Sequence, residues 1–305
     1  LYGLSKNKES ISGYSVIKTE EAIKILTKAW KLGIRYIDTA STYGDGNSDL
    51  IIKKLRAEGF PFKLFSKIGL DVSSNKFNSN RGFLKNEILK LKSHHGKFLY
   101  SVLLHSPDTE FLSKDNCFSD FIDDVKSILG EHIKVGVSLR SPADYIFIKN
   151  FNERLLIEAN LSWFDLRILK YISYDSFQKH TLLARSIYAS GIVNIICQEN
   201  FSFQSSFEKS DIRSRWDIQT LIKRNQNDVK RLQKVKAIIS KNSISDISFS
   251  LFPLLSDVLD GLIIGPLSIE ELSDSIRSHN ALKNTSPNMR LKKIVDESIK
   301  EFKNV

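Results

Sequence analysis

The chain has 305 residues, of which 41% are hydrophobic and 26% are charged, a composition that predicts a globular protein with a sizeable core. No run of about 18 apolar residues occurs, so we expect no membrane span. The formal net charge is +10, but lysine and arginine are scattered, which argues against nucleic-acid binding and favours a mild attraction for anionic cofactors or substrates. The two cysteines, Cys117 and Cys197, lack metal-type spacing and fit a reducing cytoplasm.

In chain order, amphipathic helices alternate with short apolar strands. Apolar side chains at helical spacing predict helices over residues 20–32, 48–55, 80–92, 118–129, 142–151, 165–171, 228–239, 245–255 and 268–276. Short apolar runs predict strands over residues 34–37, 62–66, 99–104, 133–137, 155–159, 181–184 and 261–265. This alternation is typical of a parallel sheet with crossover helices. Its persistence favours one α/β domain over residues 1–305, a closed (β/α)8 (TIM) barrel.

Two stretches depart from the alternation. Residues 186–227 are long for a connection, and we expect them to form a mobile flap over the mouth of the barrel. Residues 291–302 form an amphipathic tail, which we expect to pack on the exterior of the barrel.

Polar residues follow four of the predicted strands, at the point where each strand ends. They are Asp38, Lys67, His105 and Ser138, and Tyr43 lies on the loop after Asp38. Because all strand ends of a parallel barrel point to one face, we expect these side chains to converge there.

The convergent set suits proton transfer to a carbonyl oxygen. A free tyrosine has a pKa of about 10, but a neighbouring ammonium group favours the phenolate. We therefore expect Lys67, held by Asp38, to lower the pKa of Tyr43. His105 can hydrogen-bond a substrate oxygen and fix its orientation.

Six short segments in this order resemble the aldo-keto reductase family. They are DTASTYG at residues 38–44, GNSD at 46–49, SKIG at 66–69, LLHSP at 103–107, GVS at 136–138 and IIG at 263–265. The resemblance implies reduction of a small-molecule aldehyde or ketone by NADPH, with NADH as the alternative. It also implies a catalytic tetrad of Asp38, Tyr43, Lys67 and His105, in which Tyr43 is the general acid.

The start of the sequence departs from the family pattern. Residues 1–5, LYGLS, resemble the segment that follows the first barrel strand in bacterial members, and that glycine-rich strand is missing. We expect that the sequence is a fragment, since an open barrel would leave unpaired strand edges. The alternative is a barrel that closes without this strand.

The residues expected around the nicotinamide depart from the family in part. Ser138 is kept, but Leu139 replaces an asparagine and Glu158 replaces a glutamine. Arg185 stands where a tyrosine often stacks under the ring, and its planar face can also stack. An arginine here resembles bacterial members from polysaccharide biosynthesis clusters, which implies a sugar or nucleotide-sugar substrate.

At the adenosine end, the resemblance implies contacts from Gly265 and from the helix start at Ser268, whose amides favour anions. Glu271 stands where an arginine or glutamine is usual, and its carboxylate would repel a 2′-phosphate. The choice between NADPH and NADH therefore stays open, as does the loss of cofactor binding.

Two functions remain after this reading. The first is an NAD(P)H-dependent carbonyl reductase; the alternative is a catalytically weak or inactive barrel that binds or regulates. The histidines other than His105 show no ligand spacing, so we predict no metal site. Trp163 is either a core residue or a wall of the pocket. The sequence does not indicate an oligomeric state.

Overall fold

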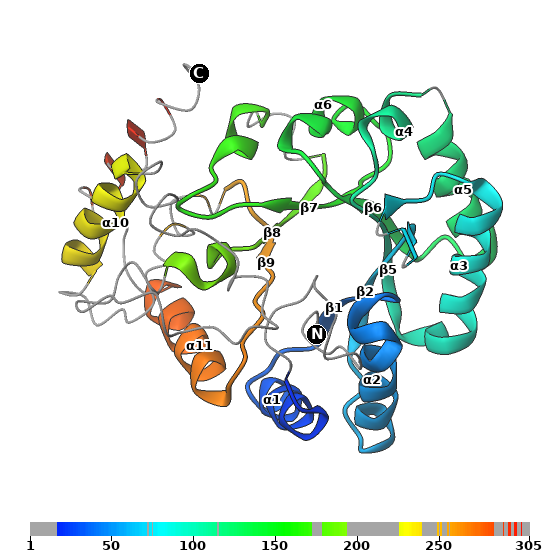
Figure 1. The fold of residues 1–305 in the computed structure, drawn as a ribbon, viewed down its shortest axis with the longest axis horizontal. Coiled ribbons are helices and arrows are strands. Elements are labelled where there is room, and N and C mark those ends of the chain that lie inside the picture. The colour runs from blue at the N-terminus through cyan, green and yellow to red at the C-terminus, as the bar shows by residue number, and fades with distance from the viewer. Residues whose placement is uncertain are drawn as a thin grey trace.

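The computed structural model describes residues 17–71, 73–74, 76–114, 116–172, 179–193, 226–239, 249, 251, 255, 257–283, 289, 292–293, 296–297 and 300. Its main feature is a parallel seven-stranded sheet in the order β1-β2-β5-β6-β7-β8-β9. The sheet curls around a centre and carries helices on its outer side (Figure 1). In the part of the chain that the structure describes, this architecture is a (β/α)8 barrel without one of its strands, as the sequence predicts.

The seven strands are β1 (Tyr36–Ala40), β2 (Lys63–Ile68), β5 (Leu99–His105), β6 (Lys134–Ser138), β7 (Leu156–Asn160), β8 (Thr181–Arg185) and β9 (Gly261–Leu262). The prediction that the first strand ends at Asp38 was wrong. Asp38, Thr39 and Ala40 all pair with β2, and this parallel ladder carries the strand two residues further. Strand β9 is shorter than predicted, although the amide of Ile263 still donates to the carbonyl of Ala184 (2.8 Å).

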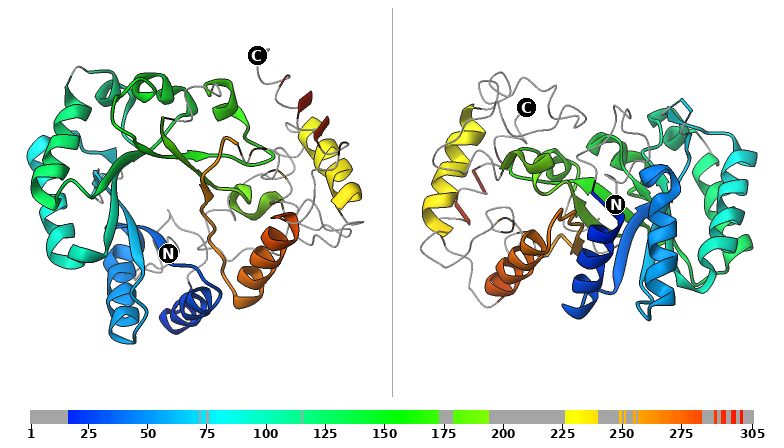
Figure 2. Two further views of the ribbon diagram at one scale, coloured as in Figure 1. Left: turned by 180° about the vertical axis from the view of Figure 1, so that it is seen from behind. Right: turned by 60° about the horizontal axis from the view of Figure 1, so that its bottom comes forward.

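The helices lie close to the positions predicted from the amphipathic pattern of the sequence. The long helices are α1 (Thr19–Lys31), α2 (Asn47–Ala57), α3 (Arg81–His95), α5 (Cys117–Leu129), α10 (Gln226–Ile239) and α11 (Ile269–Lys283). Asn80 caps α3 by accepting from the amide of Phe83 (3.0 Å), and Gly130, at φ 101°, ends α5. Helix α1 lies beside α2 and α11 (Figure 2). None of the described helices is long and apolar enough to cross a membrane.

Several short elements differ from the predictions. A hairpin of β3 (Leu70–Asp71) and β4 (Lys76–Phe77) and the helix α4 (Thr109–Ser113) were not predicted. Residues 142–151 form a 3-10 turn (Pro142–Asp144) followed by α6 (Tyr145–Ile148). Residues 165–171 contain only a 3-10 turn, because Ser162 and Asp165 pair as a bridge that keeps Asp165 extended. Most of the predicted flap, the predicted helix over residues 245–255 and most of the predicted tail lie outside the described residues.

Two layers of side chains line the inside of the curled sheet. The lower layer, here called the apolar floor, contains Tyr36, Phe65, Leu103, Leu156 and Leu183. Side chains two residues apart in a strand point to the same face. The residue two positions after each floor residue is polar, and Ser138 stands in the same relation to Gly136. These residues form the polar layer, which consists of Asp38, Lys67, His105, Ser138, Glu158 and Arg185.

The larger core, here called the outer core, lies between the sheet and its helices. It takes the alternate strand positions, such as Val102, Val135 and Ile157, together with helix residues such as Ile51 and Ile88. Because this core holds the strands from outside, the inner face is free to carry the polar layer.

Candidate functional site

Lys67 and Asp38 form a buried ion pair at the centre of the polar layer. Lys67 Nζ donates to Asp38 Oδ1, and the side chains are 2% and 15% exposed. The pair forms because Ala40 lies opposite Lys67 in the parallel register and Asp38 lies two residues before Ala40 on the same face. Burial alone would lower the pKa of Lys67, but Asp38 and Glu158 raise it above its usual value. Lys67 is therefore an ammonium group at neutral pH.

Glu158 lies on the other side of the same ammonium group. Its carboxylate is 3.6 Å from Lys67 Nζ, its side chain is 0% exposed, and no hydrogen-bond donor reaches either of its oxygens. Burial and the charge of Asp38 raise the pKa of Glu158 to about 7, against the opposing charges of Lys67 and Arg185. Two carboxylates thus share one buried cation.

Tyr43 approaches this cation from the loop after β1. It begins a 3-10 turn, η1 (Tyr43–Gly46), in which Gly44 (φ 60°) and Gly46 (φ 82°) adopt the left-handed conformation that glycine permits. Ser48 Oγ donates to the Tyr43 carbonyl (2.9 Å) and holds the turn on α2. Lys67 Nζ lies 5.1 Å from the centre of the Tyr43 ring.

The expectation that Lys67 lowers the pKa of Tyr43 below its usual value was wrong. Burial, together with the carboxylates of Asp38 and Glu158, raises this pKa to about 12. Lys67 lowers it, but only in part. Tyr43 therefore keeps its proton at neutral pH, which is the state that a proton donor needs.

His105 ends β5 and faces Tyr43. The two ring centres are 5.6 Å apart in an edge-to-face arrangement. Burial, together with the charges of Lys67 and Arg185, lowers the pKa of His105 to about 3. The imidazole is therefore neutral, and its buried Nδ1 has no hydrogen-bond partner. The structure thus brings Asp38, Tyr43, Lys67 and His105 together at one end of the sheet.

The residues predicted to contact a nicotinamide line the adjoining strand ends. Ser138, which is 2% exposed, pairs in register with His105 and with Glu158. Leu139 instead belongs to the outer core, but its carbonyl accepts a hydrogen bond from Arg185 Nη2 (2.7 Å). Arg185 is thereby anchored across three strand ends, while its buried Nε has no hydrogen-bond partner.

Asn160 is a candidate that our reading of the sequence missed. It lies at the end of β7, two residues after Glu158 and opposite Arg185 in the register, and its buried Oδ1 has no hydrogen-bond partner. The signal that could have found it is the spacing of two residues along one strand face, continued one step beyond Glu158.

The predicted adenosine end is arranged around the start of α11. Gly265 is exposed, and Ser268 Oγ accepts from the amide of Glu271 (3.1 Å), as a helix cap does. The carboxylate of Glu271 accepts from the amide of Leu267 (2.7 Å). The side chain of Glu271 therefore occupies one of the backbone N–H donors that could have bound a phosphate.

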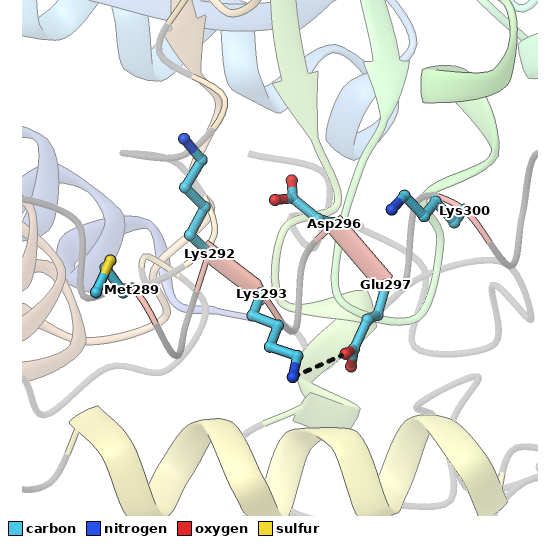
Figure 3. A pocket seen from close by; sticks show the side chains of 6 residues that line it. All are labelled: Met289, Lys292, Lys293, Asp296, Glu297 and Lys300. Atoms are coloured by element: carbon cyan, nitrogen blue, oxygen red, sulfur yellow. Dashed lines mark ion pairs between the residues drawn. The ribbon is translucent and has the colours of Figure 1, made fainter.

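The remaining features of the described chain lie apart from this constellation. Trp163 is 1% exposed and belongs to the outer core. Within the described residues, no three His, Cys, Asp or Glu side chains gather as a metal site requires. A shallow pocket near α10 contains an ion pair between Lys293 and Glu297 (3.9 Å; Figure 3). It is lined by Met289, Lys292, Lys293, Asp296, Glu297 and Lys300. No member of the polar layer lines this pocket.

Comparison with known proteins gives one family and one fold. Residues 5–146 match the model of the Aldo/keto reductase family. This segment contains the stretch from β1 to β6 and carries Asp38, Tyr43, Lys67, His105 and Ser138. No curated protein matches the chain.

Solved structures with the same fold cover nearly the whole chain. The glycerol dehydrogenase from Gluconobacter oxydans is 19% identical with a TM-score of 0.68, and the match covers 93% of this chain and 86% of that one. The holo form of an aldo-keto reductase from Bacillus halodurans is 15% identical with a TM-score of 0.62, covering 97% and 91%. At these identities the likeness establishes the barrel fold.

Proposed function

We propose that the protein is an NAD(P)H-dependent reductase that converts an aldehyde or ketone to an alcohol, because residues 5–146 match the model of the Aldo/keto reductase family. One observation carries the proposal. A protonated tyrosine, a buried ammonium group and a neutral imidazole face one another at the end of the curled sheet. These groups suit the transfer of one proton to a carbonyl oxygen.

The polar layer fits the ring end of a nicotinamide cofactor. Buried polar groups rarely lack partners in a folded protein, yet His105 Nδ1, Arg185 Nε and Asn160 Oδ1 have none, and no donor reaches either oxygen of Glu158. A carboxamide group and a carbonyl substrate together offer the donors and acceptors that such atoms need. When bound, a reduced nicotinamide supplies a hydride to the carbonyl carbon.

The proton comes from Tyr43 in this proposal. Its O–H bond breaks as a new O–H bond forms on the former carbonyl oxygen, and the phenolate left behind is stabilised by Lys67 at its side. Asp38 keeps Lys67 charged and in position. His105, being neutral, donates a ring N–H to the same oxygen and orients it.

The start of α11 favours a cofactor without a 2′-phosphate. Glu271 places a negative charge on the amide of Leu267, where a phosphate would otherwise bind. A second negative charge within a few ångströms costs about 1 kcal/mol even in water. The resemblance alone implies NADPH, but this contact leads us to propose that NADH binds more tightly.

The polar layer also favours a polar substrate. Arg185 and Asn160 border the mouth beside His105, and both offer hydrogen bonds to hydroxyl groups. Together with the resemblance to members from polysaccharide biosynthesis clusters, these side chains support a sugar or nucleotide sugar as the carbonyl compound.

A second candidate is a binding or regulatory protein with little or no turnover. Leu139 faces the core where family members place an amide, and Glu271 blocks an anion site. These contacts favour a chain that keeps the fold and loses the cofactor.

A fluorescence titration with NADH and NADPH separates the two candidates. The reductase should quench or enhance nicotinamide fluorescence at micromolar cofactor and should then oxidise the cofactor when an aldose or a generic aldehyde is added. The measurement uses the full chain. Absence of binding for both cofactors would reject the reductase in favour of the second candidate.

A further inference from the structure

Glu158 is a buried titratable group that takes no part in the proton transfer of the proposed reductase mechanism. It is 0% exposed, and Lys67 Nζ lies 3.6 Å from its carboxylate, which is beyond hydrogen-bond range. By contrast, Asp38 accepts a hydrogen bond from that ammonium group and is partly exposed. The two carboxylates therefore stand in unequal positions around one cation.

A count of charges shows which carboxylate holds a proton. With both carboxylates ionised, the trio of Asp38, Lys67 and Glu158 would carry a net charge of −1 away from bulk water, and Arg185, whose guanidinium donates to the Leu139 carbonyl, offsets this charge only in part. Lys67 donates its hydrogen bond to Asp38. Glu158 has neither that bond nor solvent, so the proton belongs on Glu158.

We propose that Glu158 is a positioning residue that binds and releases a proton beside Lys67 and so makes proton donation by Tyr43 depend on pH. The proposal rests on the proposed reductase function. This role differs from that of a contact to the carboxamide of a nicotinamide. A glutamine at this position would make such a contact at least as well.

The charged and titratable groups around Glu158 fix the direction of the effect. They are Asp38 on β1, Lys67 on β2, Tyr43 on η1 and Arg185 on β8. Burial and Asp38 raise the pKa of Glu158 to about 7, so the proton leaves as the pH rises through neutrality. The carboxylate then raises the pKa of Tyr43. Tyr43 becomes a weaker acid, and reduction slows.

The first test observes the proton itself. Infrared difference spectra of the protein without cofactor, recorded from pH 5 to pH 9, should show a protonated-carboxyl band that disappears with a midpoint near pH 7. The band should be absent from Glu158→Gln, which keeps the size of the side chain. Glu153→Gln, a change at a half-buried position just before β7 that pairs with Lys126, should retain it. A wild-type spectrum without this band would overturn the proposal.

The second test follows kcat/KM for carbonyl reduction over the same pH range. In the wild type it should fall by about threefold to tenfold around pH 7 to a lower plateau, the range expected when an acid weakens by about one pKa unit. This step should vanish in Glu158→Gln and return in Glu158→Asp with a shifted midpoint. A step that persists in Glu158→Gln, with unchanged KM for the cofactor, would also overturn the proposal.

The two tests fail independently. If the protein turns over no carbonyl compound, the proposed function fails, while the infrared band still decides whether Glu158 holds a proton. If turnover occurs and the band is missing, the function stands and the inference about Glu158 falls.

Discussion

At Tyr43, burial outweighs the neighbouring ammonium group. The pKa of this tyrosine lies near 12 because the ring is removed from water and two carboxylates offset Lys67. The tyrosine is thus fully protonated across the physiological range, and the role of Lys67 is to stabilise the phenolate after the proton has left.

Replacing Tyr43 with phenylalanine should remove the acid and little else. We expect kcat/KM for reduction to fall by about 10²-fold to 10⁴-fold, the usual contribution of a positioned acid, with cofactor affinity unchanged. Steady-state kinetics and a cofactor titration measure the two quantities. Tyr100→Phe, which alters an aromatic ring in contact with the floor residues, is the matched control and should retain turnover. Unchanged turnover in Tyr43→Phe would exclude Tyr43 as the proton donor.

Lys67→Met should reveal how much the buried cation stabilises the fold. The change leaves Asp38 and Glu158 buried without their cation, and breaking such a pair typically costs about 3–5 kcal/mol in the free energy of unfolding. Denaturant titration measures the loss. Lys63→Met, at an exposed position of the same strand, should change the free energy of unfolding by less than about 0.5 kcal/mol.

The loss in Lys67→Met should also depend on pH. Without the cation, which lowers the pKa of Glu158, that pKa rises further above its unfolded value, so the folded state binds more protons than the unfolded state. Stability therefore falls as the pH rises, and the deficit should be larger at pH 8 than at pH 5. An equal deficit at both values would show that lost packing, rather than charge, explains the effect.

At the scale of elements, the approach of β6 to β7 depends on a glycine. A Cβ atom at Gly136 would lie 1.7 Å from the carbonyl oxygen of Leu156, which is backbone and cannot move aside. We expect Gly136→Ala to lower the free energy of unfolding by about 3 kcal/mol, at the upper end of overpacking effects. Gly265→Ala, where the space is open, should leave the unfolding midpoint unchanged. Equal midpoints for both variants would contradict the close approach.

The cap of α11 should determine which cofactor binds. Glu271→Gln keeps an oxygen for the amide of Leu267 and removes the charge. We expect NADPH to bind about fivefold more tightly to this variant, because a repulsion of about 1 kcal/mol is relieved, while NADH affinity changes little. Fluorescence titration measures both affinities. Glu270→Gln, one residue earlier in the same turn, should leave the ratio unchanged, and a ratio that moves equally in both variants would remove Glu271 from this role.

At the scale of the whole molecule, sequence periodicity was sufficient to predict the barrel. Helices with clear apolar stripes, such as α1 and α5, were predicted to within a few residues because their burial follows the helical repeat. The hairpin of β3 and β4 and the start of the 3-10 turn at Arg167–Lys170 (η4) were not predicted. They depend on a two-residue pairing and on the bridge between Ser162 and Asp165, which are contacts that no local pattern encodes.

The residues of the candidate site could be predicted from the sequence, but their pKa values could not. Lys67 and His105 were found because polar residues at the ends of apolar strands are conspicuous in the sequence. The pKa of Tyr43 was predicted in the wrong direction, because the cost of desolvation depends on packing that appears only in three dimensions. Asn160 was missed for a simpler reason, since a lone asparagine at a strand end resembles an ordinary turn residue.

Of the two layers inside the sheet, the apolar floor contributes to packing and the polar layer carries the candidate reactive groups. In each strand, one residue packs in the apolar floor, and the residue two positions later contributes a polar side chain to the polar layer. Substitutions in the polar layer outside the buried cluster of Asp38, Lys67 and Glu158 can therefore alter which molecule is held without disturbing the apolar floor. Mutagenesis libraries confined to Ser138 and Arg185 should yield mostly folded variants.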